Sequence, residues 1–167
     1  MLARLLPGAH HLQNPHPLVV HFPIAFLYGA ALLYFAAWIA RRDAIAWAAL
    51  WFLVLGVISA AIAVATGWWS AGGVMLDPSV KEHVLEPHMR LMFATSALAA
   101  LLTLWAIVKR PMPASSLRYV FLLGLLVMIA LMTKGADFGG MMVYDYNGGG
   151  GACPQPIQYV PNGAPAR

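Results

Sequence analysis

Residues 17–40 read PLVVHFPIAFLYGAALLYFAAWIA, an unbroken stretch without a single Asp, Glu, Lys or Arg. Roughly 20 mostly apolar residues are enough for a helix to cross the hydrocarbon core of a bilayer. This stretch therefore predicts a membrane-spanning helix. Three further apolar stretches, at about 44–69, 88–108 and 117–133, predict three more. Together they predict an all-α membrane protein with four transmembrane helices.

The composition of the whole chain agrees with a membrane location. Of its 167 residues 61% are hydrophobic and 10% are charged, whereas a soluble domain carries about 25% charged residues. The net charge of +4 is spread over positions that flank the spans and forms no basic stripe, so we expect the lipid bilayer and no nucleic acid as a partner. The first sixteen residues contain no apolar run of signal-peptide length, so we expect the first span to direct insertion.

The basic residues of the short loops predict the orientation. Both predicted turns on one side of the membrane are basic, and they hold Arg41, Arg42, Lys109, Arg110 and Arg118. Short loops rich in Lys and Arg face the cytoplasm. We therefore expect a multi-pass protein of the bacterial inner membrane with both termini and residues 70–87 on the periplasmic side.

An internal repeat is predicted at an offset of 67, the separation of His16 from His83 along the chain. At this offset His21 also falls on His88, and the Gly-Gly pair at 72–73 falls on the pair at 139–140. The repeats span about 16–76 and 83–143. Two helix hairpins of the same, parallel topology are related by an axis along the membrane normal. Residues 1–147 are thus predicted to form one four-helix transmembrane domain, with equivalent histidines approaching its axis from opposite sides.

The two hexapeptides HPLVVH (16–21) and HVLEPH (83–88) hold four of the six histidines. Residues five apart on a helix differ by about 140° around its axis, so the two histidines of one hexapeptide do not share a face. His21 and His88 are the members predicted to face each other across the bundle. Two imidazoles on either side of a planar cofactor predict axial ligation of haem b.

The remaining residues near these histidines complete the predicted site. Pro23 lies two residues after His21 and is predicted to kink the helix and widen the space for a macrocycle. His16 and His83 are predicted as supporting donors or as ligands of a second cofactor. The predicted partners of the haem propionates are Arg90, Lys81 and Lys134.

Two other interpretations of the histidines stay open. Four imidazoles together suit Zn or Cu, although the five-residue spacing is awkward for a local metal clamp. Alternatively, the histidines are amphipathic anchors at the membrane interface. In that case the chain is a cofactor-free structural or assembly subunit. Ionisable groups inside a membrane span are costly and usually mark function, which favours the cofactor.

The composition changes after residue 133. FGGMMVYDY (138–146) is predicted to form a short strand or a cap over the outer mouth of the bundle, and not a helix. Residues 148–167 are rich in Gly and Pro and predict an irregular, extended periplasmic arm. Such an arm gains order by lying on a partner, which indicates membership in a larger assembly. The single cysteine, Cys153, lies in this arm and has no second cysteine to pair with.

HPLVVHFPIAFLYGA, ATGWW and GGMMVYDYNGG together resemble the bacterial membrane proteins catalogued as domain of unknown function 2231. The similarity covers about residues 14–150, and its motif falls on His16, His21, Pro23 and Gly139–Gly140. The resemblance implies four spans. Some members are joined to c-type cytochrome domains, which implies a redox setting. HVLEPH lacks the HP and FP pairs of HPLVVHFP, so the resemblance supports the fold more than a function.

From these observations we expect a b-type cytochrome-like subunit. It would carry electrons between a periplasmic redox protein and either quinone or a neighbouring subunit, with residues 148–167 as a docking arm. The sequence offers no nucleophile–base pair and no phosphate loop, so we expect a redox subunit of a larger enzyme complex and not an enzyme by itself.

Overall fold

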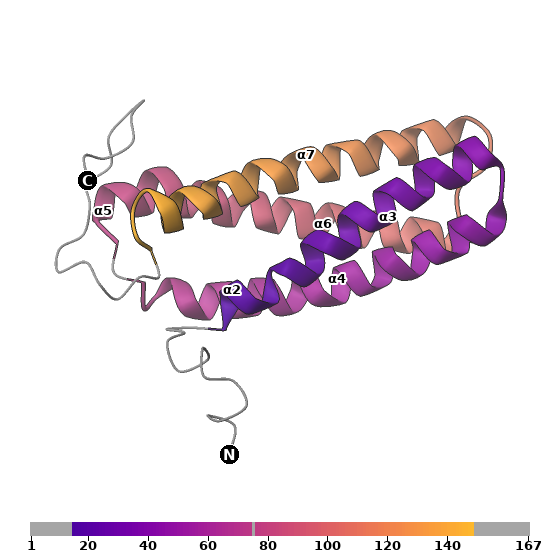
Figure 1. Ribbon diagram of the computed structural model, residues 1–167. Coiled ribbons are helices and arrows are strands. Elements are labelled where there is room, and N and C mark those ends of the chain that lie inside the picture. Colours follow the sequence, from indigo (N-terminus) through magenta and orange to yellow (C-terminus); the bar gives the residue numbers. More distant parts are fainter. Residues whose placement is uncertain (1–14, 75, 149–167) are drawn as a thin grey trace, which may run out of the picture.

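The computed structural model describes residues 15–74 and 76–148, and these are helical apart from short connections. The helices are α2 (His16–Val19), α3 (His21–Ala40), α4 (Asp43–Ala71), α5 (Pro78–Val80), the π-helix η2 (Lys81–Leu85), α6 (Glu86–Lys109) and α7 (Ser116–Tyr144). Figure 1 shows them as one elongated bundle. Four stretches are long and apolar enough to cross a membrane, namely His16–Ala40, Asp43–Ala71, Pro78–Lys109 and Ser116–Tyr144. The predicted all-α membrane fold with four spans is confirmed.

The fourth span is longer than predicted. Helix α7 continues to Tyr144, so the strand or cap predicted for residues 138–146 is wrong over most of that stretch. The reason is packing: Gly135 and Gly139 lie where α7 meets α6, and a β-carbon there would approach Met92 and His88. Close packing between helices through small residues stabilises a glycine-rich segment whose intrinsic helix propensity is low.

The third span begins earlier than predicted, because α5, η2 and α6 follow one another without a break. Asp77 caps this segment: its Oδ1 accepts hydrogen bonds from the Ser79 N–H and hydroxyl. Both bonds lower the pKa of the Asp77 carboxyl, so the cap is charged at neutral pH. The chain runs through Pro87 after a π-helical turn in which the Glu86 N–H donates to Lys81 O, five residues back. A widened turn beside a proline compensates for its missing N–H.

The two hairpins, α3–α4 and α6–α7, bury equivalent positions when their sequences are aligned at an offset of 72, which places His16 on His88. In α3 and α6 the coinciding buried residues are Pro23, Leu27, Ala30, Ala31 and Tyr34 with Thr95, Ala99, Leu102, Thr103 and Ala106. In α4 and α7 they are Ala49, Leu50, Leu53, Gly56, Ala60 and Ala63 with Phe121, Leu122, Leu125, Met128, Met132 and Gly135. The two hairpins therefore contribute matching faces to one core.

The predicted offset of 67 does not describe this packing. At 67 none of the buried residues of α3 or α4 falls on a buried residue of α6 or α7. The two offsets differ by five positions, which turns a helix by about 140°. The identities at 67 thus align residues that face different directions in the two hairpins.

Tyr34 connects α3 to neighbouring elements at the end of the bundle where Arg41 lies. Its side chain is fully buried, its hydroxyl donates to Pro111 O at 3.1 Å, and its ring meets that of Phe121 edge-on with the centroids 4.9 Å apart. One tyrosine thus links α3 to the loop between α6 and α7. The predicted arm lies outside the described residues except for Gly148, and so does Cys153.

Replacing Tyr34 with phenylalanine is expected to lower the free energy of unfolding by about 1 kcal/mol, because the carbonyl of Pro111 loses its buried donor. Denaturant unfolding in detergent, followed by circular dichroism, measures the change. Tyr119→Phe is the matched control, since Tyr119 is 62% exposed. Equal stability of the Tyr34→Phe variant and the wild type would contradict this role for the bond.

Candidate functional site

A cavity of about 450 Å³ lies between the helices at the end of the bundle where α2 is found. Its size is typical of small-molecule sites, which range from about 300 to 1,000 Å³. We call it the histidine cavity, and its end of the bundle the histidine end. Most of its lining is apolar. Its ionisable side chains are His16, His21, His88 and Tyr144, and Ser70, Thr95 and Ser96 add hydroxyl groups.

His16 enters this cavity from α2. Its Nδ1 lies 3.3 Å from Thr66 Oγ1, and the ring also hydrogen-bonds to the backbone of Ala63. The Thr66 hydroxyl itself donates to backbone carbonyls of α4, so toward the ring it is an acceptor. A β-carbon at Gly67 would come within 2.8 Å of His16 Cε1. The glycine therefore leaves room for the Cε1 edge of the imidazole to approach α4 closely.

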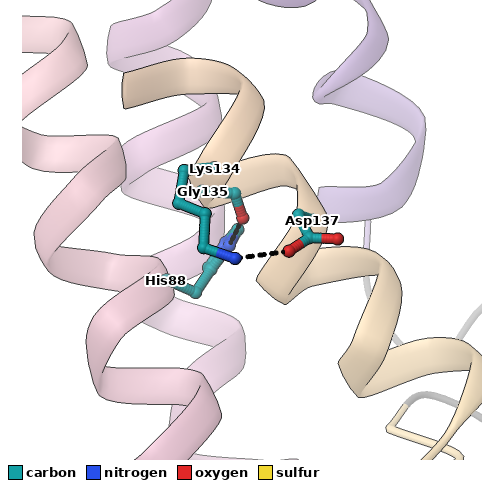
Figure 2. A network of polar contacts seen from close by, with 4 residues as sticks. All are labelled: His88, Lys134, Gly135 and Asp137. Atoms are coloured by element: carbon teal, nitrogen blue, oxygen red, sulfur yellow. Dashed lines mark hydrogen bonds and ion pairs between the residues drawn. The ribbon is translucent and has the colours of Figure 1, made fainter. Parts of the chain in front are cut away.

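His88 enters the same cavity from α6. Its Nδ1 lies 2.7 Å from Gly135 O, and Figure 2 shows the side chain reaching the backbone of α7 at this residue. A carbonyl only accepts, so Nδ1 carries the proton and donates. In a neutral imidazole this leaves the lone pair on Nε2, and a backbone bond of this kind fixes the tautomer of many metal-ligating histidines. No hydrogen bond to Nε2 is seen among the described residues.

His16 and His88 occupy equivalent places in the two hairpins. Each directly follows a proline. Each ring lies against a glycine of the second long helix of its hairpin, Gly67 of α4 for His16 and Gly139 of α7 for His88. Both line the histidine cavity. The structure therefore brings together one imidazole from each hairpin.

The other two histidines of the hexapeptides are both exposed. His21 is exposed and borders the cavity at the start of α3, whereas the sequence predicted it as the partner of His88. His83 is exposed, its Nδ1 lies 2.8 Å from Ser79 O, and it is not part of the cavity lining. Because residues 16 and 21 differ by about 140° around a helix, only His16 points from α2 toward Thr66.

The three predicted propionate partners are close to the histidine end but outside the cavity lining. Arg90 pairs with Glu86 at 3.0 Å. Lys134 pairs with Asp137 at 2.8 Å, as Figure 2 shows, and lies over the ring of Phe138. Lys81 is half-buried in η2. Both ion pairs are solvent-exposed, and such pairs contribute about 0–1 kcal/mol, so they exchange partners readily.

Classes of metal site differ in the number of ligands that the protein chain must supply. Within residues 15–74 and 76–148 no three His, Cys, Asp or Glu side chains come together in a way that could hold a metal ion. A protein-bound Zn takes three or four ligands from the chain. Haem iron takes its four equatorial nitrogens from the macrocycle and needs only two axial ligands from the protein. His16 and His88 both line one apolar cavity between helices, and two imidazole donors match the number that haem needs.

Comparison with known proteins adds a family. The model of the predicted membrane proteins named DUF2231 matches residues 13–151. No curated protein and no solved structure matches the chain. The family description names a membrane protein and no activity.

Proposed function

The chain belongs to the DUF2231 family of predicted membrane proteins, and we propose that it is a b-type cytochrome-like subunit that holds haem b in the histidine cavity. The observation that carries the proposal is the convergence of His16 and His88, one from each hairpin, on a single apolar cavity. Bound haem supplies one-electron redox chemistry. We propose that the subunit exchanges electrons with a periplasmic redox protein on one side and with quinone or a neighbouring membrane subunit on the other.

In this proposal His88 and His16 would hold the iron of bound haem. His88 has Nδ1 committed to Gly135 O, which leaves Nε2 for iron. His16 lines the same cavity from the other hairpin. His21, which the sequence predicts as the partner of His88, is exposed. Each ring packs against a glycine of another helix, Gly67 of α4 for His16 and Gly139 of α7 for His88, and the macrocycle would occupy the cavity that both rings line. Arg90, Lys134 and Lys81 remain the proposed propionate partners at the rim.

The orientation follows in the same proposal. The histidine end faces the periplasm of a bacterial inner membrane, because the basic turns at Arg41–Arg42 and Lys109–Arg110 lie at the opposite end of the bundle and cytoplasmic loops are rich in Lys and Arg. Haem near the periplasmic surface is within reach of a soluble electron carrier. The arm of residues 148–167 is the proposed docking segment for such a partner.

A visible spectrum of the protein purified from haem-replete cells tests the proposal. We expect a Soret band that sharpens and shifts on reduction with dithionite, and a haem b signature after extraction into alkaline pyridine. Elemental analysis of the same sample separates the alternatives: Zn or Cu without a Soret band indicates a metal-binding protein. A colourless sample without metal indicates a structural subunit, and either result overturns the haem proposal.

A further inference from the structure

The histidine cavity has two corresponding sides, and a pair of packed aromatic rings lies on one of them. On the α4–α6 side Trp68 and Phe93 line the cavity, and their rings pack edge-on with the centroids 5.9 Å apart. In the alignment that relates the hairpins, with His16 on His88, Trp68 corresponds to Gly140 and Phe93 corresponds to His21. A β-carbon at Gly140 would have a single neighbour, a ring atom of Tyr144 at 3.9 Å. The α3–α7 side therefore has open space where the other side has a tryptophan.

The helices on this side also separate. Among neighbouring pairs of the spanning helices α3, α4, α6 and α7, the pair α3–α7 is the least closely packed. Figure 1 shows these two helices close together near the Arg41 end and diverging toward α2. A hydrogen bond of 2.5 Å between Tyr28 and Thr133 joins the two helices. Thr133 donates to Ile129 O, so the Tyr28 hydroxyl is the donor across the helices.

On this side the cavity is bordered by His21, Gly140, Val143 and Tyr144. His21 and Tyr144 are exposed, Val143 is half exposed, and Gly140 has no side chain. We call these four residues the lateral mouth, and all of them line the cavity. An exposed imidazole in a membrane-spanning helix is costly and by default marks a functional position. At a mouth of this kind it offers a hydrogen bond to the polar edge of a molecule arriving from lipid.

We propose that the ligand of the histidine cavity is a flat, lipid-soluble ring compound that enters sideways from the membrane leaflet at the histidine end, through the lateral mouth. The identity of that compound as haem rests on the proposed function, whereas the mouth itself does not. A lipid-soluble ligand suits this route because the surface around the mouth includes the exposed apolar side chains of Leu18, Phe22 and Val143.

Gly140→Phe tests the route, because it puts into the mouth an aromatic ring like the one that Trp68 contributes on the other side. Apoprotein in liposomes is mixed with liposomes that carry haemin, and the growth of the Soret band is followed. We expect at least tenfold slower loading for Gly140→Phe. The matched control is Gly72→Phe: Gly72 lies outside the cavity lining with no neighbour closer than 4.0 Å, and we expect wild-type loading. Circular dichroism checks that both variants fold.

The outcomes separate the two proposals. If the wild type loads haem and Gly140→Phe loads equally fast, the lateral mouth is overturned and the haem proposal stands. If the wild type takes up no haem, the haem proposal fails. Entry through the lateral mouth is then tested with decylubiquinone as the ring compound. Quenching of the Trp68 fluorescence, assigned with Trp68→Phe, is then expected in the wild type and lost in Gly140→Phe. Absent or equal quenching overturns the mouth as well.

Discussion

His88→Ala and His16→Ala are each expected to lower the haem affinity of the purified protein by at least about 100-fold, and so to abolish its Soret band. Loss of a hydrogen-bond partner behind a metal ligand already lowers affinity by about 10–100-fold, and loss of the ligand itself costs more. The measurement is the ratio of Soret absorbance to protein in detergent. Added imidazole is expected to restore the band in both variants, because a free imidazole fits the space left by the missing ring. Rescue of this kind distinguishes a ligand from a residue that only supports the fold.

Two further alanine variants make this prediction specific. His83→Ala is the matched control: it lies on the segment leading into α6 but outside the cavity lining, and its band is expected to match the wild type. His21→Ala decides between the pairings. We expect it to keep the Soret band at equilibrium, since His21 is exposed at the rim. A band that survives in His16→Ala and disappears in His21→Ala would contradict the His16–His88 pair in favour of His21–His88.

Gly56→Ala is expected to lower the free energy of unfolding by about 2 kcal/mol, because overpacking a tight core costs about 1–3 kcal/mol. A β-carbon at residue 56 would lie 2.5 Å from Leu27 Cδ2 and 2.9 Å from Leu27 Cγ, with the backbone nitrogen of Leu27 at 3.4 Å. Both residues are buried in the core of the α3–α4 hairpin. The nearby backbone leaves Leu27 little room to move.

Gly124→Ala provides the comparison within the other hairpin. Its closest neighbour is the flexible tip of Leu102, Cδ2 at 2.8 Å, while the next atoms are at 3.6 Å or more. Leu102 can therefore shift, and the gain in helix propensity from Gly to Ala, about 1 kcal/mol, offsets the strain. We expect the free energy of unfolding of Gly56→Ala to be well below that of Gly124→Ala. Denaturant unfolding in detergent, followed by circular dichroism, measures both. The reverse order would show that the two glycine contacts are not what fixes the helix spacing.

The sequence predicts the four spans because length and lack of charge are sufficient to identify a membrane helix. It misplaces the end of α7 for the opposite reason: the segment around Gly135 and Gly139 has a poor helix composition, and only contacts with α6 explain its structure. The repeat is a similar case. Identities between histidines and glycines suggest an offset of 67, while burial, which decides packing, follows 72.

The candidate site is predictable in part. The sequence indicates a cofactor position near the histidine end and names His88, which does line the cavity. It pairs His88 with His21 because the offset of 67 aligns them, and it assigns His16 a supporting role. The contacts of His16 with Thr66 and Gly67 come from a helix far away in the chain, and no local pattern encodes them. A proline directly before each of His16 and His88 is the sequence signal that relates the proposed pair.

The matching burial of the two hairpins does not make the two sides of the bundle alike. Two identical hairpins would present the same surface to lipid on both sides. Here the corresponding positions differ, with a tryptophan at position 68 and a glycine at position 140. The bundle therefore combines a symmetric core with a front and a back.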